Sequence, residues 1–178
     1  MKIILLTIAI FLFLAQNISA QHSAIETAGD VGLIAVPVAA LSFTLIKNDK
    51  KGTWQFAKSF ILNQVITYGL KISINKKRPH DNGDNAFPSG HTSTTFQSAS
   101  FIHRRYGFKY SIPAYAVAGF TAFSRIDAQK HDGWDILAGT AIGIGSTYLF
   151  TTPYQQKHMQ LTFQSEDKSY LLGFQYRF

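Results

Sequence analysis

Residues 54–74 read WQFAKSFILNQVITYGLKISI, and their large apolar side chains recur close to the period of an α-helix. Four further stretches have a helical or uniformly apolar character, at residues 31–46, 89–106, 113–123 and 135–150. Short polar connections rich in Asn, Asp and Gly separate several of these stretches. The sequence therefore predicts an all-α fold, a helical bundle of about five to six helices.

The N-terminus has the pattern of a secretory signal. Lys2 precedes an apolar run from Ile3 to Ala15, and the small residues Ser19 and Ala20 follow it. The run is short beside the roughly 20 residues of a membrane-spanning helix. We therefore predict that residues 1–20 are a signal peptide, with an uncleaved signal-anchor helix as the alternative. In either case the chain continues outside the cytoplasm.

The spacing of apolar side chains changes in the C-terminal residues. Apolar and polar side chains alternate from Met159 to Gln164 and again from Tyr170 to Phe178, with a polar turn between them. This period of two predicts a β-hairpin. The chain thus divides into a signal or anchor segment at 1–20, a helical domain at 21–153 and a C-terminal β-hairpin tail at 154–178.

Composition excludes several classes of protein. With 46% hydrophobic and 15% charged residues, the chain does not have the composition of a disordered protein. The absence of cysteine excludes disulfides, thiolate metal sites and a cysteine nucleophile. The net charge of +7 suits an anionic partner, which could be nucleic acid, an anionic lipid or a phosphorylated substrate.

The placement of basic residues favours a membrane protein. If residue 21 starts outside, the basic stretches at 47–58 and 104–109 both lie inside, as the positive-inside rule expects. The polar loops at 75–90 and 125–135 then both face outward. The alternative is a soluble helical bundle whose basic loops are simply solvated.

Three polar clusters lie in or beside those outward loops: Lys71 with Arg78-Pro79; Pro88-Ser89-Gly90-His91; and Ser124-Arg125 with His131 and Asp135. His131 and Asp135 are four residues apart, so a helix would place them on one face. A carboxylate bonded to one imidazole nitrogen fixes the tautomer and leaves the other nitrogen to attack phosphorus.

The remaining residues of these clusters suit a phosphoryl group. Arginines such as Arg78 and Arg125 can bind phosphoryl oxygens bidentately, and Lys71 adds a point charge. Ser89 and the Gly90 amide would sit at a helix N-terminus, where anions bind. His91 opens that helix, well placed to protonate a leaving alkoxide.

Taken singly, these residues also have structural interpretations. Arg78 with Lys76 and Lys77 could be a basic surface run, and a His–Asp pair is more often a surface pair. The carboxylates of Asp81, Asp84, Asp127 and Asp132 fit no calcium loop, and we interpret them as loop carboxylates. The joint occurrence of the three clusters is what favours catalysis.

Together the clusters resemble the type 2 phosphatidic acid phosphatase superfamily, which includes membrane lipid phosphatases, class A bacterial acid phosphatases and vanadate-dependent haloperoxidases. The resemblance implies that His131 is the nucleophile, Asp135 its orienting partner and His91 the general acid. It also implies phosphate ligands at Lys71, Arg78, Ser89, Gly90 and Arg125, with no metal and no cofactor.

The expected function is a phosphatase that acts outside the cytoplasm on a lipid phosphate or pyrophosphate through a phosphohistidine. Phosphatidic acid, phosphatidylglycerol phosphate, undecaprenyl pyrophosphate and a lipid A phosphate are the candidate substrates, and no nucleic-acid partner is expected. The expected location is a bacterial-type envelope membrane with the active site facing the periplasm. The alternatives are a soluble periplasmic or outer-membrane-associated acid phosphatase of broad specificity and a vanadate-dependent haloperoxidase. The oligomeric state stays open.

Overall fold

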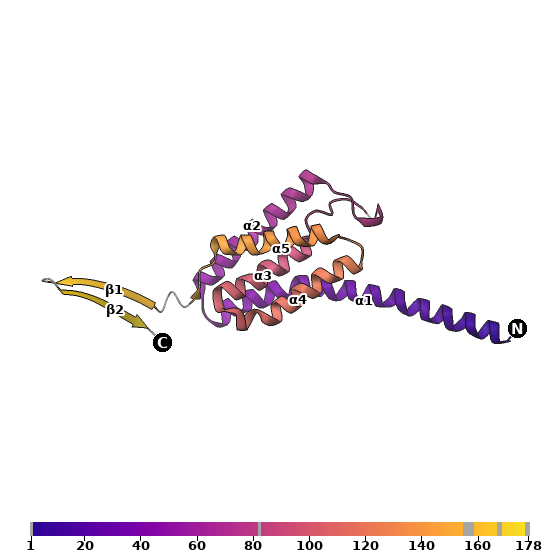
Figure 1. Cartoon of the computed structure of the whole chain (residues 1–178), viewed down its shortest axis with the longest axis horizontal. Helices are drawn as coiled ribbons and strands as arrows, with labels where there is room; N and C mark the ends of the chain where they lie inside the picture. The colour runs from indigo at the N-terminus through magenta and orange to yellow at the C-terminus, as the bar shows by residue number, and fades with distance from the viewer. Residues whose placement is uncertain (1, 82, 155–158, 167–168, 177–178) are drawn as a thin grey trace.

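The computed structural model describes the backbone of residues 2–81, 83–154, 159–166 and 169–176, and the side chains of residues 24–80, 83–154, 170, 172 and 173. The helices in these residues are α1 (Lys2–Ile46), α2 (Lys50–Ile74), a short 3₁₀ turn (Pro79–Asp81), α3 (Gly90–Tyr106), α4 (Phe108–Asp127) and α5 (Gly133–Phe150). Strands β1 (Met159–Glu166) and β2 (Ser169–Tyr176) pair antiparallel. The predicted all-α bundle with a C-terminal hairpin is confirmed (Figure 1).

Local capping explains where α3 and α5 begin. The Ser89 side chain caps α3 by accepting a hydrogen bond from Thr92 N. Asp132 and Asp135 form a reciprocal capping box at the start of α5. The sequence predicts the fourth apolar stretch at 113–123, with Pro113 near its start. The structure instead carries Pro113 inside a longer α4, so that Arg125 lies in its last turn.

Helix α3 is the centre of the bundle, since each of the other four α-helices contacts it. Most of its buried side chains are polar, and several hydrogen-bond to neighbouring helices, while Phe101 and Ile102 pack in a small apolar cluster. Ser100 Oγ donates to Thr147 Oγ1 at 2.7 Å, and Gln97 Nε2 donates to Ser59 Oγ at 2.9 Å. The core therefore depends on close helix contacts and interhelical hydrogen bonds, as is usual for helices packed within a membrane.

Glycines of α5 make its contact with α3 possible. A Cβ at Gly139 would meet the Ser89 carbonyl at 2.6 Å, and one at Gly143 would meet the backbone of Ser93 and Gln97. Gly139 and Gly143 therefore lie at a close helix contact, whereas Gly145 of the same helix has nothing within 4 Å of a Cβ.

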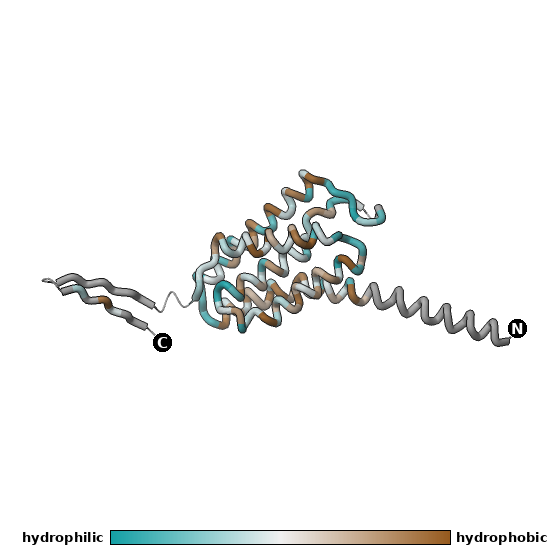
Figure 2. Tube along the Cα trace, in the orientation of Figure 1, coloured by the Kyte–Doolittle hydropathy of each residue, from teal (hydrophilic) through white to brown (hydrophobic). Residues whose placement is uncertain are grey.

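The outer surface of the bundle is largely apolar, whereas many of its buried side chains are polar. Large side chains are exposed along the helices, among them Ile46 (84% exposed), Ile72 (77%) and Leu149 (73%). One segment of the described residues, Ala24–Ile46, is long and apolar enough to cross a membrane by length and composition. Figure 2 shows hydrophilic residues concentrated in the connections between helices.

Two of those connections lie at the same end of the bundle. Residues 75–89 join α2 to α3, and residues 128–132 join α4 to α5 (Figures 1 and 2). The hairpin extends from the opposite end, beyond the end of α5. The fold thus brings the three polar clusters of the sequence to one end.

Candidate active site

A cavity of about 710 Å³ opens at this end, between α1, α2, α3 and α4. Six of the eight predicted site residues line it: Lys71, Arg78, Gly90, His91, Arg125 and His131. Asp135 lies behind His131, and Ser89 is fully buried at the start of α3. Residues that are separated by 60 positions in the sequence therefore meet around one space.

The structure places His131 beside Asp135, at a distance longer than that of a usual hydrogen bond. His131 Nδ1 lies 3.5 Å from Asp135 Oδ2, and that nitrogen has no hydrogen-bond partner among the described residues. His131 is 5% exposed and Asp135 is completely buried. The contact orients Nδ1 towards the carboxylate and leaves Nε2 as the nitrogen that can face a ligand.

The surroundings of His131 keep its ring neutral. Burial, together with the positive charges of Lys71 and Arg78, lowers the pKa of His131 to about 4, although the Asp135 carboxylate acts in the opposite direction. A neutral imidazole has the lone pair that a nucleophile needs. The electrostatics at this position are therefore compatible with the predicted attack on phosphorus.

Lys76 is a site residue that the sequence interpretation missed. Its Nζ lies 2.5 Å from Asp132 Oδ2 and 2.8 Å from Asp135 Oδ1. Burial opposes its charge, but the hydrogen bonds to Asp132 and Asp135 outweigh burial and raise the pKa of Lys76. What looked like a basic surface run thus includes a lysine that holds the carboxylate behind His131.

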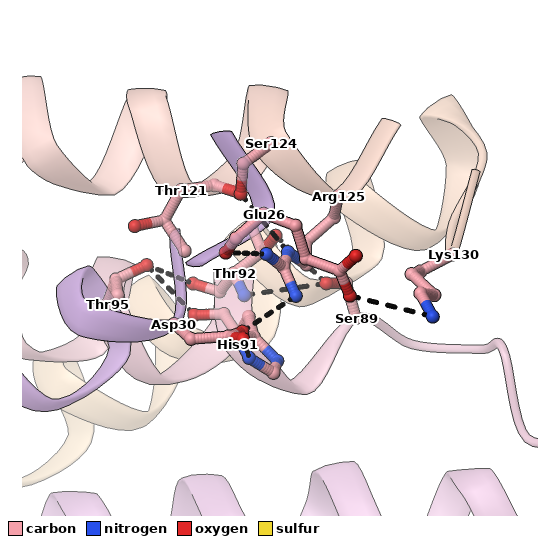
Figure 3. Close-up of polar contacts among 10 residues, drawn as sticks. All are labelled: Glu26, Asp30, Ser89, His91, Thr92, Thr95, Thr121, Ser124, Arg125 and Lys130. Atoms are coloured by element: carbon pink, nitrogen blue, oxygen red, sulfur yellow. Dashed lines mark hydrogen bonds and ion pairs between the residues drawn. The ribbon is translucent and has the colours of Figure 1, made fainter. Parts of the chain in front are cut away.

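Asp30 is the second missed residue (Figure 3). Its Oδ1 lies 2.9 Å from His91 Nε2 and 2.9 Å from Arg125 Nη1. Arg125 also donates to the Glu26 carbonyl at 2.6 Å and to Ser124 Oγ at 3.1 Å. Arg125 therefore hydrogen-bonds to α1 and also lines the cavity.

The remaining predicted phosphate ligands differ in their hydrogen-bond partners and in whether they line the cavity. Lys71 Nζ donates to the Asn85 carbonyl at 2.7 Å, and Arg78 Nε is buried without a hydrogen-bond partner among the described residues. Gly90 adjoins Lys71, since a Cβ there would lie 3.6 Å from Lys71 Cε. The Ser89 hydroxyl contacts Thr92 instead of lining the cavity, so its role as a ligand stays a prediction.

Comparison with protein families decides the identity of this arrangement. The sequence profile of the PAP2 superfamily matches residues 52–159 of this chain. The chain belongs to the PAP2 superfamily. The match contains every predicted site residue but not α1, so Asp30 lies outside it. The resemblance to type 2 phosphatidic acid phosphatases is confirmed, and with it the predicted class of enzyme, a phosphoric monoester hydrolase.

Individual PAP2 relatives are phosphatases of bacterial lipids. The chain is 32% identical over 148 residues to a lipid A 4'-phosphatase of Helicobacter pylori, which covers 77% of this chain and 74% of that protein. It is 43% identical over 77 residues to a lipid A 1-phosphatase of Porphyromonas gingivalis, covering 42% of this chain but only 17% of that protein. The crystal structure of Aquifex aeolicus LpxE has the same fold, with a TM-score of 0.64 at 21% identity over 73% of this chain and 84% of that one.

Proposed function

We propose that this PAP2 protein is a membrane phosphatase that removes a phosphate from lipid A through a phosphohistidine on His131. The observation that carries the proposal is one cavity in which neutral His131 shares its walls with Lys71, Arg78 and Arg125. Cations around a nucleophile are what phosphoryl transfer requires, because positioning and charge stabilisation supply most of its catalysis.

In the first step, His131 Nε2 attacks the phosphorus atom and the bond from phosphorus to the lipid oxygen breaks. The positive charges of Lys71, Arg78 and Arg125 bind the phosphoryl oxygens. His91 gives its proton to the leaving oxygen, so the lipid departs as an alcohol. The products of this step are the dephosphorylated lipid and phosphohistidine.

In the second step, water attacks the phosphorus atom and the bond to His131 breaks. His91, now neutral, takes a proton from that water, which restores its charged form. Inorganic phosphate leaves, and His131 returns to the neutral state that burial and the neighbouring cations favour. No atom of a metal takes part in either step.

The walls of the cavity support a lipid as the substrate. Its side between α1 and α2 is lined by apolar residues, namely Leu33, Ile34, Pro37, Val38 and Phe60. Outside the cavity, large apolar side chains are exposed on α1, α2 and α5. A surface of this kind suits the hydrocarbon of a membrane. Both curated relatives are named for lipid A, which is why we choose it over the other lipid phosphates.

The charges of the connections support a periplasmic site. The end of the bundle away from the cavity carries Lys47, Lys50 and Lys51 before and within α2, and Arg104 and Arg105 at the end of α3. Cytoplasmic connections are enriched in Lys and Arg. We therefore place that end in the cytoplasm and the cavity in the periplasm.

Phosphate release from a panel of substrates tests the proposal. The purified protein in detergent is incubated with bisphosphorylated lipid A, phosphatidic acid, phosphatidylglycerol phosphate and p-nitrophenyl phosphate, each with and without EDTA. We expect release from lipid A that EDTA does not reduce, and mass spectrometry of the product then identifies the 1- or 4'-position. Release from p-nitrophenyl phosphate alone would refute the lipid substrate, and a requirement for added Mg²⁺ would refute the mechanism.

A further inference from the structure

Asp30 connects two residues to which the proposed reaction gives different roles. Its Oδ1 accepts a hydrogen bond from Arg125 Nη1 at 2.9 Å and lies 2.9 Å from His91 Nε2. Figure 3 shows the three side chains converging from α1, α4 and α3. A single carboxylate oxygen therefore joins the proposed general acid to a proposed phosphate ligand.

The packing of α1 against α4 holds Asp30 in this position. A Cβ at Gly29 would collide with Ser124 and Arg125, and a Cβ at Gly32 would collide with Thr121. Because these positions lack side chains, the backbone of α1 comes close to α4. The short Asp30 side chain can therefore reach Arg125. The contact is thus built into the helix packing.

The charges around His91 give this contact a chemical consequence. Burial lowers the pKa of His91, and the positive charges of Arg125 from α4 and Lys71 from α2 lower it further. The carboxylate of Asp30 from α1 opposes this shift and raises the pKa of the ring. Nearby cations disfavour an imidazolium, and a nearby carboxylate stabilises it. A general acid must carry its proton before it can donate it.

We propose that Asp30 is a positioning residue for the leaving-group acid: its carboxylate fixes the His91 ring and stabilises the imidazolium that protonates the leaving oxygen. As the bond between phosphorus and oxygen breaks, one proton moves from His91 to that oxygen, and the neutral ring keeps its hydrogen bond to Asp30. The inference rests on the proposed function, because it takes His91 as the acid of that reaction.

The first test compares leaving groups in Asp30→Asn, which preserves the size of the side chain and removes its charge. With an alkyl phosphate or lipid A, whose leaving oxygen needs the proton, we expect turnover to fall by about tenfold or more. With p-nitrophenyl phosphate, whose leaving group is stable as an anion, we expect a loss below about threefold. An equal loss with both substrates would indicate a purely structural role and overturn the proposal.

Glu26→Gln provides the matched control. Glu26 is the other acidic residue of α1, and its carboxylate lies 3.5 Å from Lys130 Nζ. The substitution removes the same charge one helical turn away, and we expect it to leave the ratio between the two substrates unchanged. A gain in activity of Asp30→Asn together with tighter phosphate inhibition would also overturn the proposal, because Asp30 would then be a competitor of the substrate for Arg125.

A double-mutant cycle tests whether Asp30 acts through His91. If it does, adding Asp30→Asn to a His91→Gln background lowers turnover of the alkyl phosphate by less than about twofold. A further tenfold loss would place the effect of Asp30 elsewhere, for example in Arg125.

An activity-independent measurement separates failure of this inference from failure of the proposed function. The His91 ring is titrated by NMR in detergent with ¹⁵N-labelled histidine, and its signals are assigned by their loss in His91→Gln. In Asp30→Asn, we expect the ring to lose its proton at least tenfold more readily than in the wild type. An unchanged midpoint would overturn the inference even if the enzyme is active. A wild type that releases no phosphate would refute only the proposed function.

Discussion

Lys76 Nζ lies 2.8 Å from Asp135 Oδ1, closer to that carboxylate than the ring of His131, whose Nδ1 is 3.5 Å from Oδ2. The backbone N–H of Asp132 donates to Oδ2 at 3.0 Å. The carboxylate behind the proposed nucleophile is therefore held by a lysine on one oxygen and by a capping box on the other. Lys76 thus helps to set the direction from which Asp135 faces His131.

Removing this lysine charge should affect both stability and turnover. In Lys76→Gln, the fully buried Asp135 loses its cation, and an incompletely compensated buried charge costs about 1–3 kcal/mol. We expect a lower melting temperature and a kcat reduced about tenfold with little change in KM, because orientation and not substrate binding is lost. Lys77→Gln removes the same charge from the adjacent residue and is the control. Equal effects of the two substitutions would contradict the prediction.

Much of the site could be predicted from the sequence because its chemistry is encoded in short motifs. Six of the eight predicted site residues line one cavity, and Ser89 and Asp135 lie behind its walls. Lys76 and Asp30 were missed for two different reasons. Lys76 is indistinguishable from its basic neighbours until the fold places it against α5. Asp30 lies on an apolar helix with no motif around it, and only the packing of α1 on α4 reveals its partners.

The class of fold was also predictable, but some helix boundaries were not. Apolar periodicity identified the helical segments, since it reflects the faces that each helix buries or exposes. It gave no reason to extend α4 to Asp127, because the residues after Phe123 are mostly polar. Their helical state depends on tertiary contacts such as those of the buried Arg125 with α1.

Close packing between α3 and α5 provides a prediction about stability. A methyl group at Gly143 would clash with the backbone of Ser93 and Gln97, so Gly143→Ala should destabilise the protein by about 1–3 kcal/mol. Gly145→Ala adds the same methyl group where nothing lies within 4 Å. It should be neutral or slightly stabilising, since alanine is the better helix former. Thermal unfolding in detergent measures both, and equal melting temperatures would contradict the packing argument.

The pKa of His131 makes stability depend on pH. The ordinary imidazole pKa is 6.5, whereas folding lowers the pKa of His131 to about 4. Between these values the unfolded state binds a proton that the folded state does not, so acidification favours unfolding. Wild-type protein should lose about 1 kcal/mol for each pH unit below 6.5, relative to His131→Asn. Melting curves from pH 7 to 4.5 test this, and parallel curves for the two proteins would contradict it.

Membrane orientation can be tested with single cysteines, because the chain contains none. Asp84→Cys lies in the connection beside the cavity, and Lys51→Cys lies in the first turn of α2 at the other end. A membrane-impermeant thiol reagent should label the first in right-side-out inner-membrane vesicles and the second only in inside-out vesicles. The reverse pattern would place the cavity in the cytoplasm.

Replacing each of the two cavity histidines should impair a different part of the reaction. His131→Ala removes the proposed nucleophile, so turnover should vanish for every substrate. His91→Ala removes only the leaving-group acid, whose contribution is about 10²–10⁴ for an alkoxide. Because p-nitrophenolate is stable as an anion, phosphohistidine should still form from p-nitrophenyl phosphate in His91→Ala. It should accumulate there, since the residue that activates water in the second step is also missing.

The direct measurement is ³²P labelling of the protein, with an alkaline quench because phosphohistidine is labile to acid. Label should be present in His91→Ala and absent in His131→Ala. Asp135→Asn should fold and retain weak labelling, since it leaves the imidazole in place but removes the charge that orients it, by analogy with a triad carboxylate. Label that persists in His131→Ala and disappears in His91→Ala would mean that the two roles are exchanged. His91 would then be the nucleophile, and Asp30 would be the carboxylate that orients it.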